Sequence, residues 1–347
     1  MRERRWPIYM MEAEFNMGKI LVLGGAGYIG SHTVYELLDK GYGVVVADNL
    51  ETGHRQAVHP DAKLYIGDIR NREFVDGVFE KEEIDAVVHF AAYSLVGESM
   101  TDPLKYYGNN VGGTQVLLAS MAAHGIDKIV FSSTAAAYGE PKRTPILETD
   151  PTEPTNTYGA TKLAMEQMFK WTELAHGIRY TSLRYFNACG AHPSGEIGED
   201  HRPETHLIPI VLQAANGTRP SISVFGTDYD TKDGTCVRDY IHVCDLAQAH
   251  AQAVRYLMDG GKSDIFNLGN GVGFTVREII NAAEGVVGHN IPTVFAERRA
   301  GDPAVLVASS DKAKSVLGWK PQYADIHAIL ETAWKWHRTH PKGFSEN

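Results

Sequence analysis

A tyrosine and a lysine spaced by one helical turn are the residues of this chain best suited to chemistry. Tyr158 and Lys162 lie in the segment TYGATKLAMEQM, where apolar residues recur with helical periodicity after the proline-bearing loop PTEPTN. Because a helical turn takes about four residues, both side chains leave the same face of the predicted helix. A nearby ammonium favours the charged form of a phenol, so we expect Tyr158 to act as a base.

Three hydroxyl side chains end a predicted strand that precedes this helix. The strand reads IVFSST and ends in Ser132, Ser133 and Thr134. Parallel α/β sheets bind their ligands at the carboxyl ends of the strands, so we expect these hydroxyls to lie beside the substrate. We predict that Thr134 hydrogen-bonds a reacting hydroxyl and relays its proton to Tyr158.

A glycine-rich turn near the N-terminus predicts a dinucleotide site. Gly24, Gly27 and Gly30 follow an apolar run and precede a helical pattern, so the bare backbone can approach a pyrophosphate at a helix N-terminus. Asp48, after the next strand, can accept hydrogen bonds from both ribose hydroxyls but would repel a 2′-phosphate, which favours NAD over NADP. Asp68, after the third strand, could accept a hydrogen bond from the adenine amino group or could cap a helix.

The elements that must position these residues alternate regularly between strands and helices. Apolar strand-sized runs and helical patterns follow one another with short connections, which predicts βαβ units and a doubly wound parallel sheet of the Rossmann type. The predicted strands are 18–23, 44–47, KLYIGDI, DAVVHFAA, DKIVFSST and DIFNL, and the predicted helices are 31–40, 72–82, 106–124, the segment from Tyr158, and 243–258.

A second, smaller lobe is expected to be interleaved with the first. After Asn187 the segment AHPSGEIGEDHRPETHLIP is rich in Pro, Gly, His and charge, which indicates irregular structure that carries binding groups. We expect residues 1–17 to be a mobile extension. We assign 18–187 plus about 236–269 to the nucleotide domain, and 188–235 plus about 270–347, with closing helices from Asp311, to the substrate lobe.

Bulk composition excludes several classes of function. A net charge of −10 argues against general binding to nucleic acid or anionic membranes. Apolar runs are strand-sized, so no membrane span is expected. Cys189, Cys236 and Cys244 lack C-x-x-C spacing, which favours packing roles in a reducing cytoplasm. Fifteen histidines show no H-E-x-x-H or similar spacing, so no metal site is expected.

The motifs together resemble UDP-galactose 4-epimerases of the extended short-chain dehydrogenase/reductase family over essentially the whole chain from Met17. The matching segments include GGAGYIGSH, HFAA, VGES, YYGNNVGGT, TYGATK, LRYFNACGAHPSGEIGED, DGTCVRDYIHV and RRAGDP. For catalysis the resemblance implies Thr134, Tyr158 and Lys162. Around the cofactor it implies Tyr28, Ile29, Asp48, Asn49, Asp68, Ile69, Phe90, Ala91, Ala92, Asn109 and Phe186, and around the UDP-sugar it implies Asn187, His206, Leu207, Phe225, Arg238, Arg299 and Asp302.

Physical chemistry supports part of this substrate set, and three positions depart from the family pattern. Arg238 and Arg299 are suited to bidentate contacts with a diphosphate. Ser94 stands where many relatives have a lysine near the cofactor, and His206 stands where relatives often have asparagine. Leu306 matches a position at which a large tyrosine excludes N-acetylated sugars and a small residue admits them.

The implied activity is reversible C4 epimerisation of UDP-glucose and UDP-galactose through a transient 4-keto sugar and NADH. A UDP-N-acetylglucosamine 4-epimerase or a dual-specificity enzyme is the alternative, and a non-catalytic NAD or UDP-sugar sensor is the alternative from another class. Dehydration is disfavoured because Ala135 and Ala136 stand where dehydratases have an Asp-Glu pair. The resemblance also implies a homodimer, built by the helices over 106–124 and 158–174.

Overall fold

A seven-stranded parallel sheet forms the centre of the molecule. The computed structural model describes residues 17–298 and 303–344. Its large sheet has the strand order β10-β6-β5-β4-β1-β2-β3, and every neighbouring pair is parallel. The strands are β1 (Lys19–Leu23), β2 (Gly43–Asp48), β3 (Lys63–Ile66), β4 (Ala86–His89), β5 (Lys128–Thr134), β6 (Arg179–Tyr185) and β10 (Asp264–Leu268). The predicted doubly wound α/β fold is confirmed.

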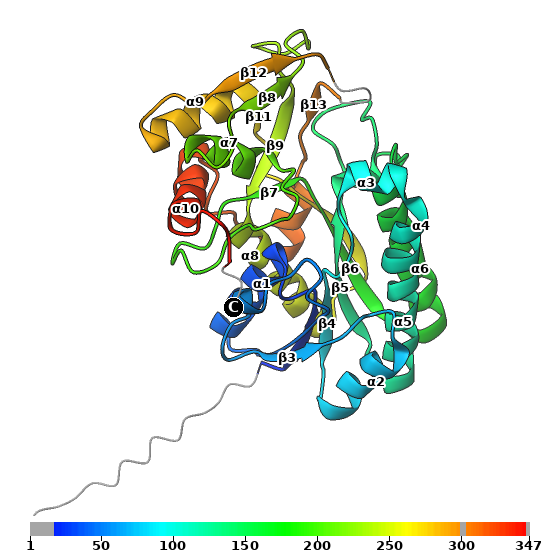
Figure 1. Cartoon of the computed structure of the whole chain (residues 1–347). Helices are drawn as coiled ribbons and strands as arrows, with labels where there is room; N and C mark the ends of the chain where they lie inside the picture. Colours follow the sequence, from blue (N-terminus) through cyan, green and yellow to red (C-terminus); the bar gives the residue numbers. More distant parts are fainter. Residues whose placement is uncertain (1–16, 299–302, 345–347) are drawn as a thin grey trace, which may run out of the picture.

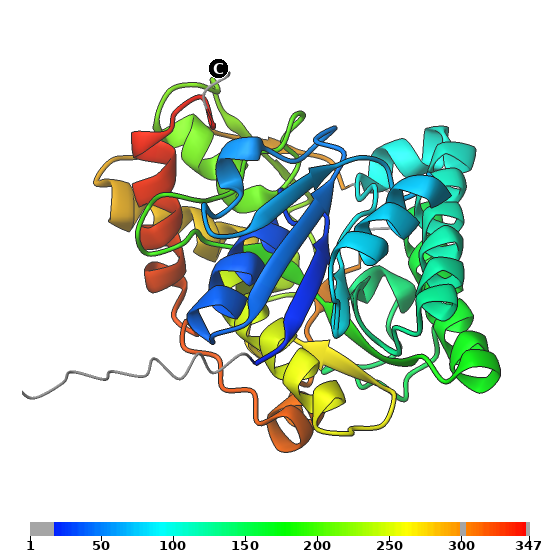
Figure 2. The same ribbon diagram turned by 90° about the horizontal axis from the view of Figure 1, so that it is seen from below.

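Helices cover both faces of this sheet, as Figure 2 shows from below. In β1, Ile20 and Val22 point to the face under α1 and α8, while Leu21 and Leu23 point to the face under α2, α5 and α6. Strand side chains alternate between faces, so a continuously apolar strand is buried on both sides. The helices are α1 (Tyr28–Asp39), α2 (Arg72–Lys81), α3 (Val96–Thr101), α4 (Pro103–Tyr106), α5 (Gly112–His124), α6 (Thr157–His176) and α8 (Val243–Met258).

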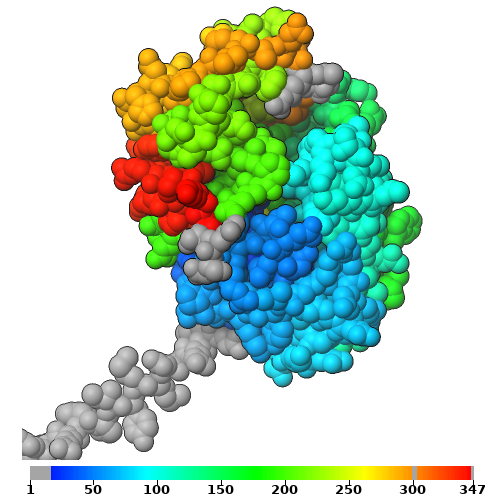
Figure 3. Space-filling model, viewed as in Figure 1, coloured from blue at the N-terminus to red at the C-terminus, as the bar shows by residue number. Residues whose placement is uncertain are grey.

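The smaller lobe lies at the carboxyl ends of the large sheet (Figure 1). It has one sheet in which β9 (Val237–His242) pairs with β7 (Asn187–Cys189), β11 (Gly273–Thr275) and β13 (Val305–Leu306), and a second in which β8 (Ile222–Phe225) pairs with β12 (Thr293–Ala296). Three helices, α7 (Leu207–Ala215), α9 (Val276–Val287) and α10 (Ile326–Thr339), pack around the core of this lobe. The surface is hollowed between this lobe and the part of the chain that holds α3 (Figure 3).

The chain passes between the two lobes more often than the expected boundaries imply. The segment 236–269 was expected to lie wholly in the nucleotide domain, but β9 belongs to the small lobe, and only α8 and β10 return to the large sheet. Ala313 and Trp319 likewise pack in the core under α8, and Trp319 Nε1 donates to Asp245 O at 2.9 Å. The tail from Asp311 therefore does not serve the small lobe alone.

Two further expectations concern the ends of the chain and membranes. The expected extension 1–17 falls almost wholly outside the described residues, which begin at Met17. Within residues 17–298 and 303–344, no helix is both long and apolar enough to cross a bilayer.

Candidate functional site

The start of α6 brings Tyr158 and Lys162 to the carboxyl end of β5. Asn156 caps this helix by accepting a hydrogen bond from Gly159 N at 2.8 Å, which fixes its first turn. Lys162 is buried, its Nζ donates to Ser132 O at 2.7 Å, and it lies 5.9 Å from the centre of the Tyr158 ring. The two side chains therefore share one face of the helix, directed at the end of the strand.

Thr134 completes this corner as the last residue of β5. Its hydroxyl accepts a hydrogen bond from Ala136 N at 3.1 Å, and a side-chain bond to Tyr158 favours the phenolate. The structure thus brings Thr134, Tyr158 and Lys162 together. In chemical terms, the corner offers a phenol, a hydroxyl in contact with it and a cationic group one turn away.

Burial moves the acidities of the two titrating groups in opposite directions. It raises the pKa of Tyr158 to about 12, against a smaller opposite effect of the bond to Thr134. It lowers the pKa of Lys162 to about 7, with only partial compensation by the charge of Glu166. Lys162 Nζ is directed to Ser132 O, and burial is the largest influence on the pKa of both groups.

A buried ion pair behind the corner was missed from the sequence. Arg184 holds Glu166 with two bonds, Nε to Oε1 at 2.9 Å and Nη2 to Oε2 at 2.5 Å, and Ser133 Oγ donates to the same Oε1 at 2.6 Å. Glu166 lies one turn beyond Lys162, so the spacing Tyr-x-x-x-Lys-x-x-x-Glu was the available signal. This pair fixes α6 against β5 and β6.

Hydrogen bonds also tie α6 to the segment that follows β4. Tyr158 N donates to Ser99 Oγ at 3.1 Å, and Asn110 Nδ2 donates to Thr161 Oγ1 at 3.1 Å. Asn109 and Asn110 lie in a π-helical segment, Tyr107–Val111, inside the predicted helix over 106–124. Such segments often occur at functional sites, and Asn109 is one of the expected cofactor residues.

The glycine turn has the form that a pyrophosphate site requires. Gly24 has a φ of +77°, and a Cβ there would lie 2.7 Å from Ala91 N, while a Cβ at Gly30 would lie 2.1 Å from Gly24 O. At Gly27 a Cβ would meet, among the described residues, only Gly24 O at 3.4 Å. Gly24 and Gly30 are therefore needed for packing, whereas Gly27 leaves an open approach to the N-terminus of α1, which no described side chain caps.

Asp48 and Asp68 differ in how they are held. Asp48 accepts bonds from Ala26 N at 2.9 Å and Leu50 N at 2.8 Å, and burial raises its pKa despite these bonds. Asp68 makes a two-bond contact with Arg70, which lowers its pKa. The alternative that Asp68 caps a helix is wrong, because Asn71 caps α2.

The other expected cofactor residues surround these carboxylates and the turn. Tyr28 Oη donates to Gly190 O at 2.6 Å, which joins the turn to the small lobe. Phe90 stacks near His250, with ring centres 4.6 Å apart, and Phe186 is buried beside Tyr138. Ile29, Ile69 and Ala91 pack into the cores beneath the sheet, Asn49 bonds Glu51, and Ala92 is partly buried. The exposed Ser94 lies nearby in sequence.

The expected substrate residues lie on the small lobe. Asn187 Nδ2 donates to Asp239 O at 2.8 Å, and Arg238 pairs in register with Leu306 between β9 and β13. Leu306 packs at the edge of the cluster that contains Phe186, and Phe225 ends β8. The predictions for Arg299 and Asp302 lie outside the described residues.

His206 and Leu207, two of the expected substrate residues, lie where the loop after β7 meets α7. Leu207 is the first residue of α7, but His206 Nδ1 lies 2.8 Å from Glu199 Oε1 and 3.3 Å from Glu204 Oε1. His201 lies against the same two carboxylates, so these residues form a group that could hold a metal ion. No metal site is expected from the sequence, and the signal available for this group is the pattern Glu-x-His-x-x-Glu-x-His in the loop.

Comparisons with known proteins agree with this geometry. Residues 20–269 match the model of the NAD dependent epimerase/dehydratase family. The UDP-glucose 4-epimerase of Lacticaseibacillus casei is 60% identical over 94% of this chain and 99% of the relative. A crystal structure of a UDP-glucose 4-epimerase superposes with a TM-score of 0.93 at 56% identity, covering 94% of this chain and 100% of the other.

One solved neighbour is a complex with ligands. The UDP-glucose 4-epimerase of Bifidobacterium longum, in complex with NAD⁺ and UDP, has a TM-score of 0.89 and 41% identity over 94% of this chain and all of the other. The family model, the sequence relatives and the structural neighbours all indicate the same family. The chain therefore belongs to the NAD dependent epimerase/dehydratase family, and within it to the UDP-glucose 4-epimerases.

Proposed function

We propose that this protein interconverts UDP-glucose and UDP-galactose by inverting C4 through a transient 4-keto sugar, with NAD as its cofactor. The observation that carries this proposal is the meeting of Thr134, Tyr158 and Lys162 at the carboxyl end of β5. The likeness to UDP-glucose 4-epimerases along nearly the whole chain supports it.

In this scheme the side chains of the corner hold and move the proton of the C4 hydroxyl. Thr134 hydrogen-bonds that hydroxyl and passes its proton to Tyr158, which returns it when the epimer forms. When bound, NAD⁺ would supply a hydride acceptor that carries a positive charge. Such a charge opposes the effect of burial, which alone keeps Tyr158 protonated at neutral pH.

Binding energy is expected to come from the ends of each ligand and not from the reacting sugar. On the nucleotide side we assign the open N-terminus of α1 to the pyrophosphate, Asp48 to the ribose and Asp68 to the adenine. This divides the chain into a nucleotide domain, 18–187 with α8 and β10, and a UDP-sugar lobe formed by most of the remainder from 188 onward. Residues assigned to the UDP-sugar are Asn187, Leu207, Phe225, Arg238, Arg299 and Asp302, together with His206 through its ring nitrogen Nε2, since its Nδ1 faces Glu199 and Glu204.

Turnover without added cofactor tests the proposal directly. Purified protein is incubated with UDP-galactose, and the C4 epimers are followed by NMR until their ratio is constant. We expect turnover without added NAD because the hydride removed is returned in each cycle, and the same final ratio from UDP-glucose because both directions reach one equilibrium. A protein that binds both nucleotides but leaves UDP-galactose unchanged would be the non-catalytic sensor.

N-acetylated sugars are a second candidate substrate class. Leu306 is partly buried next to Arg238 and smaller than a tyrosine, so the position that faces the C2 substituent in the family is not filled by an aromatic ring. Incubation with UDP-N-acetylgalactosamine, under the same conditions, measures whether the protein has dual specificity.

We further propose a cytoplasmic homodimer. Several large apolar side chains are exposed on α3, α4, α6 and the adjoining π segment, which lie together in Figure 1: Met100, Leu104, Tyr107, Trp171 and Leu174. Exposed apolar groups concentrated on neighbouring helices favour an interface. Sedimentation of the protein should give twice the chain mass, and Trp171→Glu with Leu174→Glu should yield monomers.

A further inference from the structure

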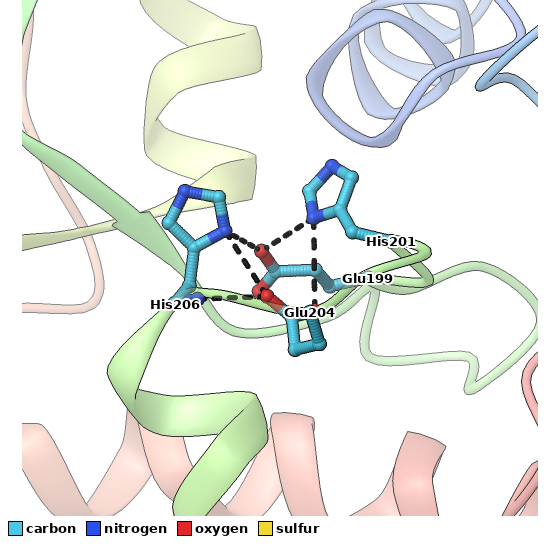
Figure 4. Close-up of side chains that lie close together, drawn as sticks. All are labelled: Glu199, His201, Glu204 and His206. Carbon is cyan, nitrogen blue, oxygen red and sulfur yellow. Dashed lines mark hydrogen bonds and ion pairs between the residues drawn. The ribbon is translucent and has the colours of Figure 1, made fainter. Parts of the chain in front are cut away.

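Four potential metal ligands converge in the loop between β7 and α7, away from the Tyr158 corner. Glu199, His201, Glu204 and His206 each direct one ligand atom toward the others, and all four atoms lie within 4.8 Å of one another (Figure 4). Imidazole nitrogen and carboxylate oxygen are both ordinary zinc ligands. The group therefore has the chemistry of an N₂O₂ metal site.

The distances within the group match those of a tetrahedral ion. Bonds of about 2.0–2.2 Å to zinc, at tetrahedral angles, separate neighbouring ligand atoms by roughly 3.3–3.5 Å. His201 Nδ1 lies 3.1 Å from Glu199 Oε1 and 3.7 Å from Glu204 Oε2. His206 Nδ1 lies 2.8 Å from Glu199 Oε1 and 3.3 Å from Glu204 Oε1. Small adjustments of the side chains would accommodate one ion.

A buried atom without a hydrogen-bond partner gives an independent sign of a ligand. The Glu199 side chain is only 3% exposed, and within the described residues its Oε1 has no partner with hydrogen-bond geometry, nor has His201 Nδ1. These two atoms approach one another closely but are not aligned as donor and acceptor. Their contacts are ion pairs without hydrogen-bond alignment, and ligand atoms that converge in this way are also arranged as the ligands of an ion are.

The surroundings hold the ligands in place and leave access to solvent. Glu204 Oε1 accepts hydrogen bonds from Thr205 N at 2.7 Å and His206 N at 2.8 Å, which fixes that carboxylate as an outer shell does in metal sites. A cavity of about 530 Å³ is lined in part by Glu199, His201 and Glu204, which gives an ion a route in.

We propose that Glu199, His201, Glu204 and His206 bind one zinc ion that stabilises the loop between β7 and α7. Two carboxylates balance the charge of a divalent cation, and four protein ligands leave no open position, which is the pattern of a structural site. The His201 ring lies 6.0 Å from that of Tyr28, which bonds Gly190 O at the start of the same loop. Zinc thus strengthens the link between the small lobe and the glycine turn.

Metal content and thermal unfolding of the full-length protein test the site without relying on activity. Protein dialysed against metal-free buffer should retain about one zinc per chain by elemental analysis. Chelation should lower the unfolding midpoint, and ZnCl₂ should restore it while MgCl₂ does not, because magnesium prefers six oxygen ligands. Unchanged unfolding on chelation and on zinc addition would mean that the cluster consists only of imidazolium–carboxylate pairs.

Variants locate the ion if it is found. His201→Gln should weaken zinc binding at least about tenfold and remove the response of the unfolding midpoint to zinc. His192→Gln, in the same loop but outside the cluster, should bind zinc like the unchanged protein. Equal zinc content in the two variants would overturn the assignment, and the measurements on the unchanged chain still decide the matter if His201→Gln fails to fold.

Discussion

Two regions of the molecule shift the pKa of a cationic group in opposite directions. They are the Tyr158 corner and the cluster of Glu199, His201, Glu204 and His206. Burial without a touching carboxylate lowers the pKa of Lys162 to about 7. At His201 burial also lowers the pKa, but Glu199 and Glu204 outweigh it and raise the value to about 9. The comparison teaches that contacting carboxylates can outweigh burial and keep a group charged, whereas without such a contact burial favours the neutral form.

The two regions should therefore respond differently to substitution. The corner keeps a buried amine that favours the unfolded state, an arrangement common at catalytic sites. The cluster joins opposite charges and favours the folded state. Substitutions in the corner should change turnover more than stability, and substitutions in the cluster should do the reverse.

Tyr158→Phe should have the largest effect of all. Loss of the proton-transferring oxygen should lower kcat for UDP-galactose by about 10² to 10⁴-fold, with little change in the unfolding midpoint. NMR of the two epimers and a thermal melt measure these quantities. Tyr256→Phe on α8 is the matched control, and equal activity of the two variants would contradict the assignment of Tyr158.

Glu199→Gln should have the next largest effect, which is a loss of stability. It removes a buried carboxylate that faces His201 and His206, so we expect a loss on the order of 3 kcal/mol in the free energy of unfolding. Urea denaturation measures it, and kcat of the folded fraction should stay within a few fold. A variant as stable as the unchanged protein would show that the cluster contributes nothing to folding.

Lys162→Met should show opposite signs for activity and stability. In the nucleotide-free protein the pKa of Lys162 is about 7 in the folded state and 10.5 in the unfolded state. Between these pH values, unfolding therefore takes up a proton. The unchanged protein therefore loses stability as the pH falls through this window. At pH 7 the variant should be more stable by a few kcal/mol, but much less active.

Urea denaturation of the two nucleotide-free proteins from pH 7 to 10.5 checks this prediction. Their stabilities should converge toward the alkaline end, where the lysine is neutral in both states. A constant difference across the range would mean that Lys162 remains charged in the folded protein.

Leu306 should give the smallest effect, and on substrate choice alone. Leu306→Gly enlarges the region beside Arg238, so the ratio of turnover with UDP-N-acetylgalactosamine to that with UDP-galactose should rise by roughly tenfold, and Leu306→Tyr should lower it. Initial rates with both substrates measure the ratio. An unchanged ratio in both variants would remove Leu306 from the sugar pocket.

Regular elements explain why much of the site could be predicted. The spacing of Tyr158 and Lys162 becomes a shared helix face once α6 forms. Gly24 and Gly27 precede α1, and Gly30 lies in its first turn. Trp319 shows the limit, since its apolar side chain indicated burial but not which core it joins. The loop from Gly190 to His206 has no periodicity, so the spacing of its residues did not predict which side chains lie close together.

By itself the sequence determined the parallel sheet, the dinucleotide turn and the helix that presents Tyr158, because local periodicity and turn chemistry specify these elements. Only the tertiary structure decided that Lys162 donates to Ser132 O, that Arg184 lies against Glu166, and that four loop side chains converge around Glu199. Those contacts join segments distant along the chain or in irregular backbone. Their electrostatics depends on burial, which no spacing along the chain defines.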